Sequence, residues 1–156
     1  VGIIGDTHLP YCIPGYRNFC YETFLRFGVS DIIHIGDEVD NAALSYHQSE
    51  LAMPNAISEA EQAQEKLNQW YATFPDVKVC VGNHSALPFR QATTAGIPKR
   101  FLKSYEEIWE APKGWKWEMQ WELDGVLYEH GTGTGDISGA RNTFTLIWRC
   151  IEYGKS

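Results

Sequence analysis

The sequence predicts an α/β domain built around a parallel sheet, and two observations support this prediction. Short runs rich in valine and isoleucine alternate along the chain with segments whose apolar residues recur at helical spacing, which is the order expected of β-α-β units. Each of these runs ends in glycine followed by acids, histidine or asparagine. Because the carboxyl ends of parallel strands meet at one edge of a sheet, we expect these polar residues to converge.

Three strands are expected in the first half of the chain, at residues 1–4, 31–36 and 77–81. Each run is short and largely apolar, as is typical of strands buried on both faces of a sheet. Glycine at the end of each run lets the backbone turn as it leaves the sheet. The polar residues that follow are therefore placed on loops at the strand ends.

Two helices are expected between these strands. Residues 16–27 carry apolar side chains at helical spacing, and Gly28 is a suitable C-cap. Residues 58–74 form the clearest helical pattern, with Ser58 and Glu61 matching a capping box. Its aromatic-rich face is expected to pack against the sheet rather than to bind a ligand.

The pattern changes in the second half of the chain. Residues 87–114 indicate loop and short helix because prolines interrupt them. Residues 115–123 alternate strictly between apolar and polar, which predicts a strand with one solvated face and antiparallel pairing. The dipeptide at 124–125 predicts a hairpin turn into a strand at 126–128, which ends beside His130. A final helix is expected over 140–153, with Gly154 as its C-cap.

The chain has 156 residues, 44% of them hydrophobic, and a formal net charge of −7. These values suit one domain with its own core. The negative charge disfavours proteins that coat nucleic acid through their overall field, but not a metal-dependent nuclease. With no apolar run of membrane-spanning length and no visible secretory signal, we expect a cytoplasmic protein without a membrane partner. Val1 opens directly in a strand with no methionine before it, so we expect further residues upstream.

The cysteines favour the same compartment, because none is part of a C-x-x-C pair. We expect them to be reduced and mostly buried, which disfavours a zinc site built from thiolates. They are Cys12, Cys20, Cys80 and Cys150.

Four short motifs contain residues that bind metals or transfer protons. They are Asp6 with His8, the G-D-E-V-D run at 36–40, G-N-H at 82–84, and His130 followed by glycine. A D-x-H pair alone occurs often by chance, with a hydrogen-bonded loop histidine as the simpler interpretation. Its repetition at successive strand ends favours one shared site in which carboxylates and imidazoles bind divalent metal ions.

In their order and strand context, these motifs resemble the calcineurin-like metallophosphoesterases over nearly the whole chain, 1–156. Residues 88–97 and the tryptophan-rich hairpin after them are similar to small phage and bacterial members of that superfamily. The resemblance implies an α/β/β/α sandwich in one domain and an enzyme that hydrolyses phosphomonoesters or phosphodiesters by a metal-bound hydroxide. Nucleotides or nucleic acid are among the implied substrates, and the bacterial cytoplasm is the implied location, in a bacterial or phage-encoded protein.

The resemblance also implies two divalent metal ions, manganese first, with iron, zinc, nickel, cobalt or magnesium as alternatives. Asp6 and His8 would bind the first ion, and Asp37 would bridge both. Asn83 and His130 would bind the second ion. One carboxylate can span two ions because it has two oxygens, whereas the neutral asparagine limits the negative charge of the site.

His84 is implied to be catalytic rather than a ligand, protonating the leaving oxygen or stabilising developing charge, which suits a group with an ordinary pKa near neutrality. Arg90 and Arg141 are candidates for contacting the phosphate, with solvated arginines as the alternative. Arg90 is the stronger candidate because it follows G-N-H closely. Asp40 is expected to hydrogen-bond near the site rather than to bind metal.

Other polar residues have simpler interpretations. His34 is expected to pack inside its strand, although an indirect role toward the metals stays open. His47 lies in the ambiguous segment 42–55 and is expected at the surface. The glycine-rich residues 131–135 lack the lysine of a P-loop and are expected to form a flexible connection.

The sequence departs from the family pattern at two points. Ser85 stands where the family has an acidic residue that orients the histidine, so the positioning of His84 is in question. The final G-H-x-H motif, which would add one histidine to each metal, is absent. We therefore expect the chain to be truncated before that motif and to lack the C-terminal strands of the fold.

These departures favour a second hypothesis, a catalytically weak phosphoesterase-fold scaffold that binds a protein partner. The retention of every other motif residue argues against it, because a scaffold has no need of them. A purely structural metal site is a third option, disfavoured because such sites are closed and rich in thiolates. The sequence leaves the substrate, the native metal and the oligomeric state open.

Overall fold

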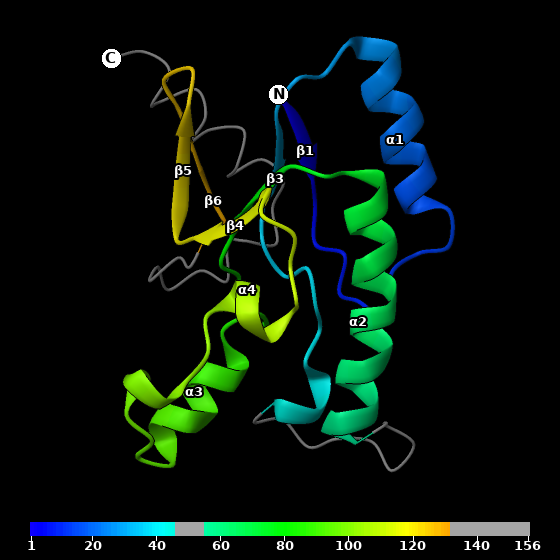
Figure 1. The fold of residues 1–156 in the computed structure, drawn as a ribbon. Coiled ribbons are helices and arrows are strands. Elements are labelled where there is room, and N and C mark those ends of the chain that lie inside the picture. The colour runs from blue at the N-terminus through cyan, green and yellow to red at the C-terminus, as the bar shows by residue number, and fades with distance from the viewer. Residues whose placement is uncertain (46–54, 132–156) are drawn as a thin grey trace.

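The computed structural model describes residues 1–45 and 55–131 of the chain. They form a mixed α/β fold whose main sheet has four parallel strands in the order β1-β2-β3-β4 (Figure 1). Its strands are β1 (Gly2–Ile4), β2 (Ile32–His34), β3 (Val77–Cys80) and β4 (Trp115–Glu118). A separate antiparallel pair consists of β5 (Gln120–Leu123) and β6 (Val126–Glu129). The predicted α/β class and parallel sheet are confirmed.

Helices connect the parallel strands. The α-helices are α1 (Tyr16–Phe27), α2 (Ala56–Thr73), α3 (Leu87–Thr94) and α4 (Tyr105–Ile108). Short 3-10 helices cover η1 (Ala42–Leu44) and η2 (Lys99–Phe101). The bounds predicted for α1 are confirmed, and Gly28 caps it in the left-handed conformation at φ 62°. The loop and short helices predicted between residues 87 and 114 are also observed.

Helix α2 begins before the predicted residue. Its N-cap is Asn55, whose side chain accepts a hydrogen bond from the N–H of Ser58 at 2.9 Å. Ser58 therefore already lies in the first turn, and the capping box assigned to Ser58 and Glu61 is wrong. Asparagine is among the strongest N-cap residues, which explains why the helix begins there.

The strand predicted over 115–123 is two strands that belong to different sheets. Strand β4 pairs with β3 in parallel, so the predicted antiparallel pairing is wrong for this part. The burial pattern is confirmed, because Trp115 and Trp117 are buried while the residues between and after them are exposed. Strand β5 then pairs with β6 through the predicted turn, where Asp124 and Gly125 have φ 53° and 73°.

The core lies on one face of the main sheet, under α1 and α2, with α4 at its edge. Figure 1 shows α1 and α2 together on one side of the sheet and the β5–β6 hairpin on the other. The hairpin contacts β3 directly, because Trp121 Nε1 donates to the carbonyl of Val79 at 2.9 Å. The aromatic face of α2 is confirmed as core, since Trp70 is buried against the sheet residues. The cluster includes Ile4, Leu67, Trp70, Phe74, Val77, Val79, Trp115 and Trp117.

No helix within residues 1–45 and 55–131 is long and apolar enough to cross a membrane. In the same part of the chain, Cys12, Cys20 and Cys80 are free thiols, as predicted. Cys150, the helix predicted over 140–153, its C-cap Gly154 and most of the loop at 131–135 lie outside the described residues.

Candidate metal centre

The loops that leave β1 and β2 run side by side beyond the sheet. The N–H of His8 donates to the carbonyl of Asp37 at 2.9 Å, and the N–H of Asp40 donates to the carbonyl of Leu9 at 3.0 Å. His8 and Asp37 both have positive φ, 43° and 51°. Residues other than glycine seldom adopt this conformation, and such strain tends to collect at functional sites. The main-chain bonds therefore hold two of the predicted metal ligands next to each other.

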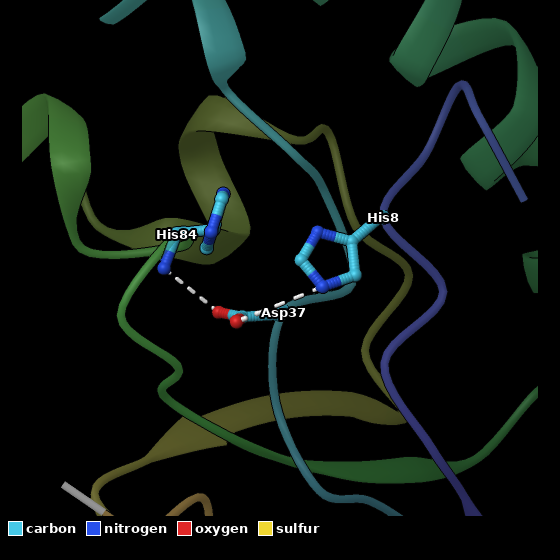
Figure 2. A group of neighbouring side chains, drawn as sticks. All are labelled: His8, Asp37 and His84. Carbon is cyan, nitrogen blue, oxygen red and sulfur yellow. Dashed lines mark hydrogen bonds and ion pairs between the residues drawn. The ribbon is translucent and has the colours of Figure 1, made fainter. Parts of the chain in front are cut away.

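Asp37 is the central residue of the cluster and is only 3% exposed. Its Oδ1 accepts the main-chain N–H of His84 at 2.8 Å, while Oδ2 lies 3.2 Å from Nε2 of His130 and 3.9 Å from Nε2 of His8. Figure 2 shows the carboxylate between His8 and His84. Burial alone would raise the pKa of Asp37, but the hydrogen bond and charge of His130 outweigh it and lower that pKa.

Two glycines in the motifs make this approach possible. A Cβ at Gly82 would collide with the carboxylate and the main-chain nitrogen of Asp37. A Cβ at Gly36, which has φ 106°, would collide with the ring of His130. Gly36 and Gly82 therefore allow close contact between loops, which a side chain at either position would prevent.

Asp40 joins two histidines. Its Oδ1 lies 2.6 Å from Nδ1 of His8 and 3.1 Å from Nδ1 of His84, and its carbonyl oxygen lies 2.6 Å from the same atom of His84. Because these oxygens only accept, Nδ1 of each ring carries the hydrogen, which leaves Nε2 of His8 free to bind a metal. The hydrogen bonds from the two histidines outweigh burial and lower the pKa of Asp40. Mainly through Asp40, the pKa of His84 is raised to about 9.

His130 connects the remaining predicted ligands. Its Nε2 lies 2.8 Å from Oδ1 of Asn83, and its Nδ1 lies 2.8 Å from the carbonyl of Ile35 and 3.7 Å from Oδ1 of Asp6. Burial lowers the pKa of His130, but the hydrogen bond and charge of Asp37 outweigh burial and raise that pKa. Both ring nitrogens therefore face oxygen acceptors, and a metal ion at Nε2 would replace a proton.

Of the predicted metal ligands, His8 and His130 lie beside Asp37, while Asn83 and Asp6 lie beside His130. They come from loops that follow β1, β2, β3 and β6. Carboxylate and amide oxygens with imidazole nitrogens are a suitable donor set for Mn²⁺, Fe²⁺ or Zn²⁺. His8, Asp37 and His84 each offer a ligand atom, and these atoms lie within 4.8 Å of one another. This cluster includes His84, to which the family resemblance gives a catalytic role instead.

A buried carboxyl beneath the site was not identified from the sequence. Glu38 is 1% exposed, its Oε2 accepts from Ser85 Oγ at 2.6 Å, and its Oε1 accepts from Trp117 Nε1 at 3.1 Å. Burial raises the pKa of Glu38. Ser85 thus contacts Glu38 rather than orienting His84, and Asp40 supplies the carboxylate beside that histidine. Ser85, which follows G-N-H, is the one sequence signal that the carboxylate beside His84 has to come from another part of the chain.

The arginine candidates stay predictions. Arg90 lies on the exposed side of α3, which begins three residues after His84. Arg141 and His47 lie outside the described residues. His34 is fully packed beneath the site, and burial lowers its pKa to about 3.

No family model, curated protein or solved structure matches the chain. The chemistry of the site is therefore inferred from its own residues and from the order of its motifs.

Proposed function

We propose that the chain is a dinuclear metal-dependent phosphoesterase of the calcineurin-like type, which hydrolyses phosphomonoesters or phosphodiesters. The observation that supports this most strongly is the approach of His8, His84 and His130, on three separate loops, to the buried carboxylate of Asp37 on a fourth. A set of chance motifs would not place oxygen and imidazole donors around one buried carboxylate. The α/β/β/α sandwich and manganese as the first metal are parts of the same proposal.

The residues divide into two proposed roles. Asp6 and His8 bind one ion, Asn83 and His130 bind the other, and Asp37 bridges them. When bound, two such ions polarise the phosphate, supply a nucleophile from water at neutral pH and align an in-line displacement. Asp37 suits the bridging role because its Oδ2 faces Nε2 of His8 and Nε2 of His130, which are assigned to different ions, while the main-chain N–H of His84 holds Oδ1.

His84 is the proposed general acid. Asp40 holds its Nδ1, so Nε2 is the nitrogen that can give a proton to the leaving oxygen. The ring is about one-third exposed, which leaves room for a substrate to reach it. Asp40 acts on both sides of the site, since it also fixes the ring of His8.

The test compares metal binding and turnover in the same preparations. Metal-free protein is titrated with Mn²⁺ by calorimetry, and hydrolysis of p-nitrophenyl phosphate and bis-p-nitrophenyl phosphate is then measured with Mn²⁺ present. Asp37→Asn is the test variant, and Asp31→Asn is its matched control. Asp31 is a hydrogen-bonded carboxylate at the opposite end of β2, paired with Lys78 at 3.4 Å.

We expect two bound ions and turnover in the wild type and in Asp31→Asn. Asp37→Asn should lose binding of at least one ion and roughly 10²-fold or more in turnover, because charge stabilisation by the ions contributes several kcal/mol. Equal background rates in all three proteins would overturn the enzyme proposal. Metal binding without turnover would favour the scaffold hypothesis instead.

A further inference from the structure

Polar side chains buried beneath the proposed ligands join the loops that carry those ligands. Thr7 is 3% exposed and lies in the sequence between Asp6 and His8. His34 is 1% exposed and lies at the end of β2, three residues before Asp37. Neither side chain is placed among the metal ligands or given a catalytic role. Both lie on the side of the loops that faces the core.

A chain of hydrogen bonds with a defined direction passes through these two residues. The N–H of Gly36 donates to Nδ1 of His34 at 3.2 Å. Nδ1 is therefore the acceptor, so the ring hydrogen is on Nε2, which lies 3.1 Å from Oγ1 of Thr7. The hydroxyl of Thr7 then donates to the carbonyl of Glu38 at 2.9 Å. Each donor in this series of hydrogen bonds has one acceptor, and no other placement of the hydrogens satisfies all of these contacts.

This series of hydrogen bonds holds the loop of Asp6 and His8 against the loop that carries Asp37. On the outer side, the main-chain bond from His8 to Asp37 holds the two loops together at 2.9 Å. On the inner side, the hydroxyl of Thr7 makes the corresponding link to Glu38 and also accepts from His34. Glu38 is itself held by Ser85 and Trp117, so the link extends to the loop after β3 and to β4.

We propose that Thr7 and His34 are positioning residues that set the spacing between the Asp6–His8 pair and Asp37, and so set the affinity for the ion bound by that pair. This inference rests on the proposed dinuclear site. Removing the hydroxyl leaves the Nε2–H of His34 buried without its acceptor and leaves the carbonyl of Glu38 with the N–H of Leu9 alone, at 3.0 Å. The loops have to shift to satisfy the histidine. Direct hydrogen-bonding partners of metal ligands typically change metal affinity by about 10- to 100-fold when they are mutated. Thr7 acts through the main chain of Glu38, next to Asp37, so we expect an effect at the lower end of that range.

The test uses Thr7→Val, which keeps the shape and removes the hydroxyl, and Thr7→Ser, which keeps the hydroxyl. The matched control is Thr73→Val at the end of α2, which also removes a hydroxyl that donates to a main-chain carbonyl, here that of Gln69 at 2.8 Å. Co²⁺ is titrated into each metal-free protein and followed by calorimetry and by visible absorption. Circular dichroism checks the fold.

We expect Thr7→Val to weaken one of the two Co²⁺ affinities by about tenfold or more and to change the cobalt spectrum of that site. Thr7→Ser and Thr73→Val should bind both ions within about threefold of the wild type. A purely structural role for Thr7 would lower the thermal stability of the metal-free protein and leave both affinities and the spectrum alone.

The outcomes separate this inference from the proposed function. Wild-type protein that binds no Co²⁺ would overturn both. Wild-type protein that binds two ions, with Thr7→Val binding them equally well, would overturn only the positioning role. Should Thr7→Val fail to fold, His34→Gln replaces it, because this change removes the acceptor of Gly36 and keeps Thr7 in place. The same selective loss of one affinity is then required, and unchanged affinities would refute the inference.

Discussion

Oδ1 of Asp40 lies 2.6 Å from Nδ1 of His8, so a residue predicted to stand beside the site holds the ring of a proposed ligand directly. The same oxygen lies 3.1 Å from Nδ1 of His84. One carboxylate therefore orients a proposed metal ligand and the proposed general acid together. The rings of the two histidines meet edge to face with their centres 4.7 Å apart, so neither can turn without disturbing the other.

Asp40→Asn tests this shared role. The amide keeps the shape and can still accept from one ring, but it has no charge and cannot orient both rings equally. We expect metal affinity to fall about 10- to 100-fold and kcat to fall as well, because both histidines lose their fixed orientation. Mn²⁺ calorimetry and turnover of p-nitrophenyl phosphate at saturating metal measure the two effects, with Asp31→Asn as control. If the variant has lower metal affinity but an unchanged kcat at saturating metal, Asp40 does not orient His84 for catalysis.

His84→Gln distinguishes an acid from a ligand. If His84 is the proton donor, the variant should still bind two Mn²⁺ ions but lose about 10²- to 10⁴-fold in kcat, the usual contribution of general acid catalysis. The position of its ring within the group formed with His8 and Asp37 allows the opposite result, in which one ion is lost. Counting bound ions by calorimetry before measuring turnover decides between these roles. Loss of an ion would make His84 a ligand, and unchanged turnover would exclude both roles.

Gly82→Ala tests the close contact between the third motif and Asp37. The added methyl group would collide with the carboxylate and main-chain nitrogen of Asp37, so the loop has to move away. We expect a loss of about 1–3 kcal/mol in the free energy of unfolding, the usual cost of overpacking, together with weaker metal binding. Gly5→Ala is the matched control, because a Cβ there meets only the hydroxyl of Tyr16 at 3.9 Å. Urea unfolding and Mn²⁺ titration of both variants measure the difference, and equal behaviour would contradict the collision.

The sequence predicted which residues converge because strand ends are readable from it. Each run of β-branched residues predicts a strand, and the glycine after it predicts where the strand ends. Because the strands are parallel, their carboxyl ends lie at one edge of the sheet. This reasoning placed His8 and Asp37 together, although no strand within residues 1–45 and 55–131 spans more than four residues. Helix α1 was predicted with its bounds because both its apolar spacing and its glycine C-cap are local signals.

Most features that the sequence did not predict depend on partners distant in the chain, and one is a local choice between cap residues. The alternation of apolar and polar residues over 115–118 indicates that one face of the strand is buried. The same alternation is expected whether the neighbouring strand is parallel or antiparallel, so it could not predict the parallel pairing with β3. The N-cap was mispredicted because Asn55 and Ser58 are both favourable N-cap residues, and the sequence alone does not show which of them begins the helix. The contacts of Glu38 with Ser85 and Trp117 join the loops after β2 and β3 to strand β4, and no spacing in the sequence encodes them.

The buried state of His34 predicts a dependence of stability on pH. Burial lowers the pKa of this ring from its ordinary value of 6.5 to about 3, and its Nδ1 has to stay unprotonated to accept from Gly36. The ring of His34 therefore binds a proton near pH 6.5 in the unfolded chain, but only near pH 3 in the folded protein. This contribution to stability is fully present above pH 6.5 and is lost as the pH falls toward 3.

His34→Gln should remove that dependence. Between about pH 6 and pH 4, the free energy of unfolding of the wild type should fall relative to that of the variant by up to about 1.4 kcal/mol per pH unit, the value for one proton. Urea unfolding of metal-free protein over this range gives both curves. Taking the difference between them cancels groups that titrate alike in both proteins, such as Glu38, whose raised pKa acts in the opposite direction. Parallel curves would mean that the folded protein accommodates the protonated ring, and the fixed hydrogen-bond direction through Thr7 would then be wrong.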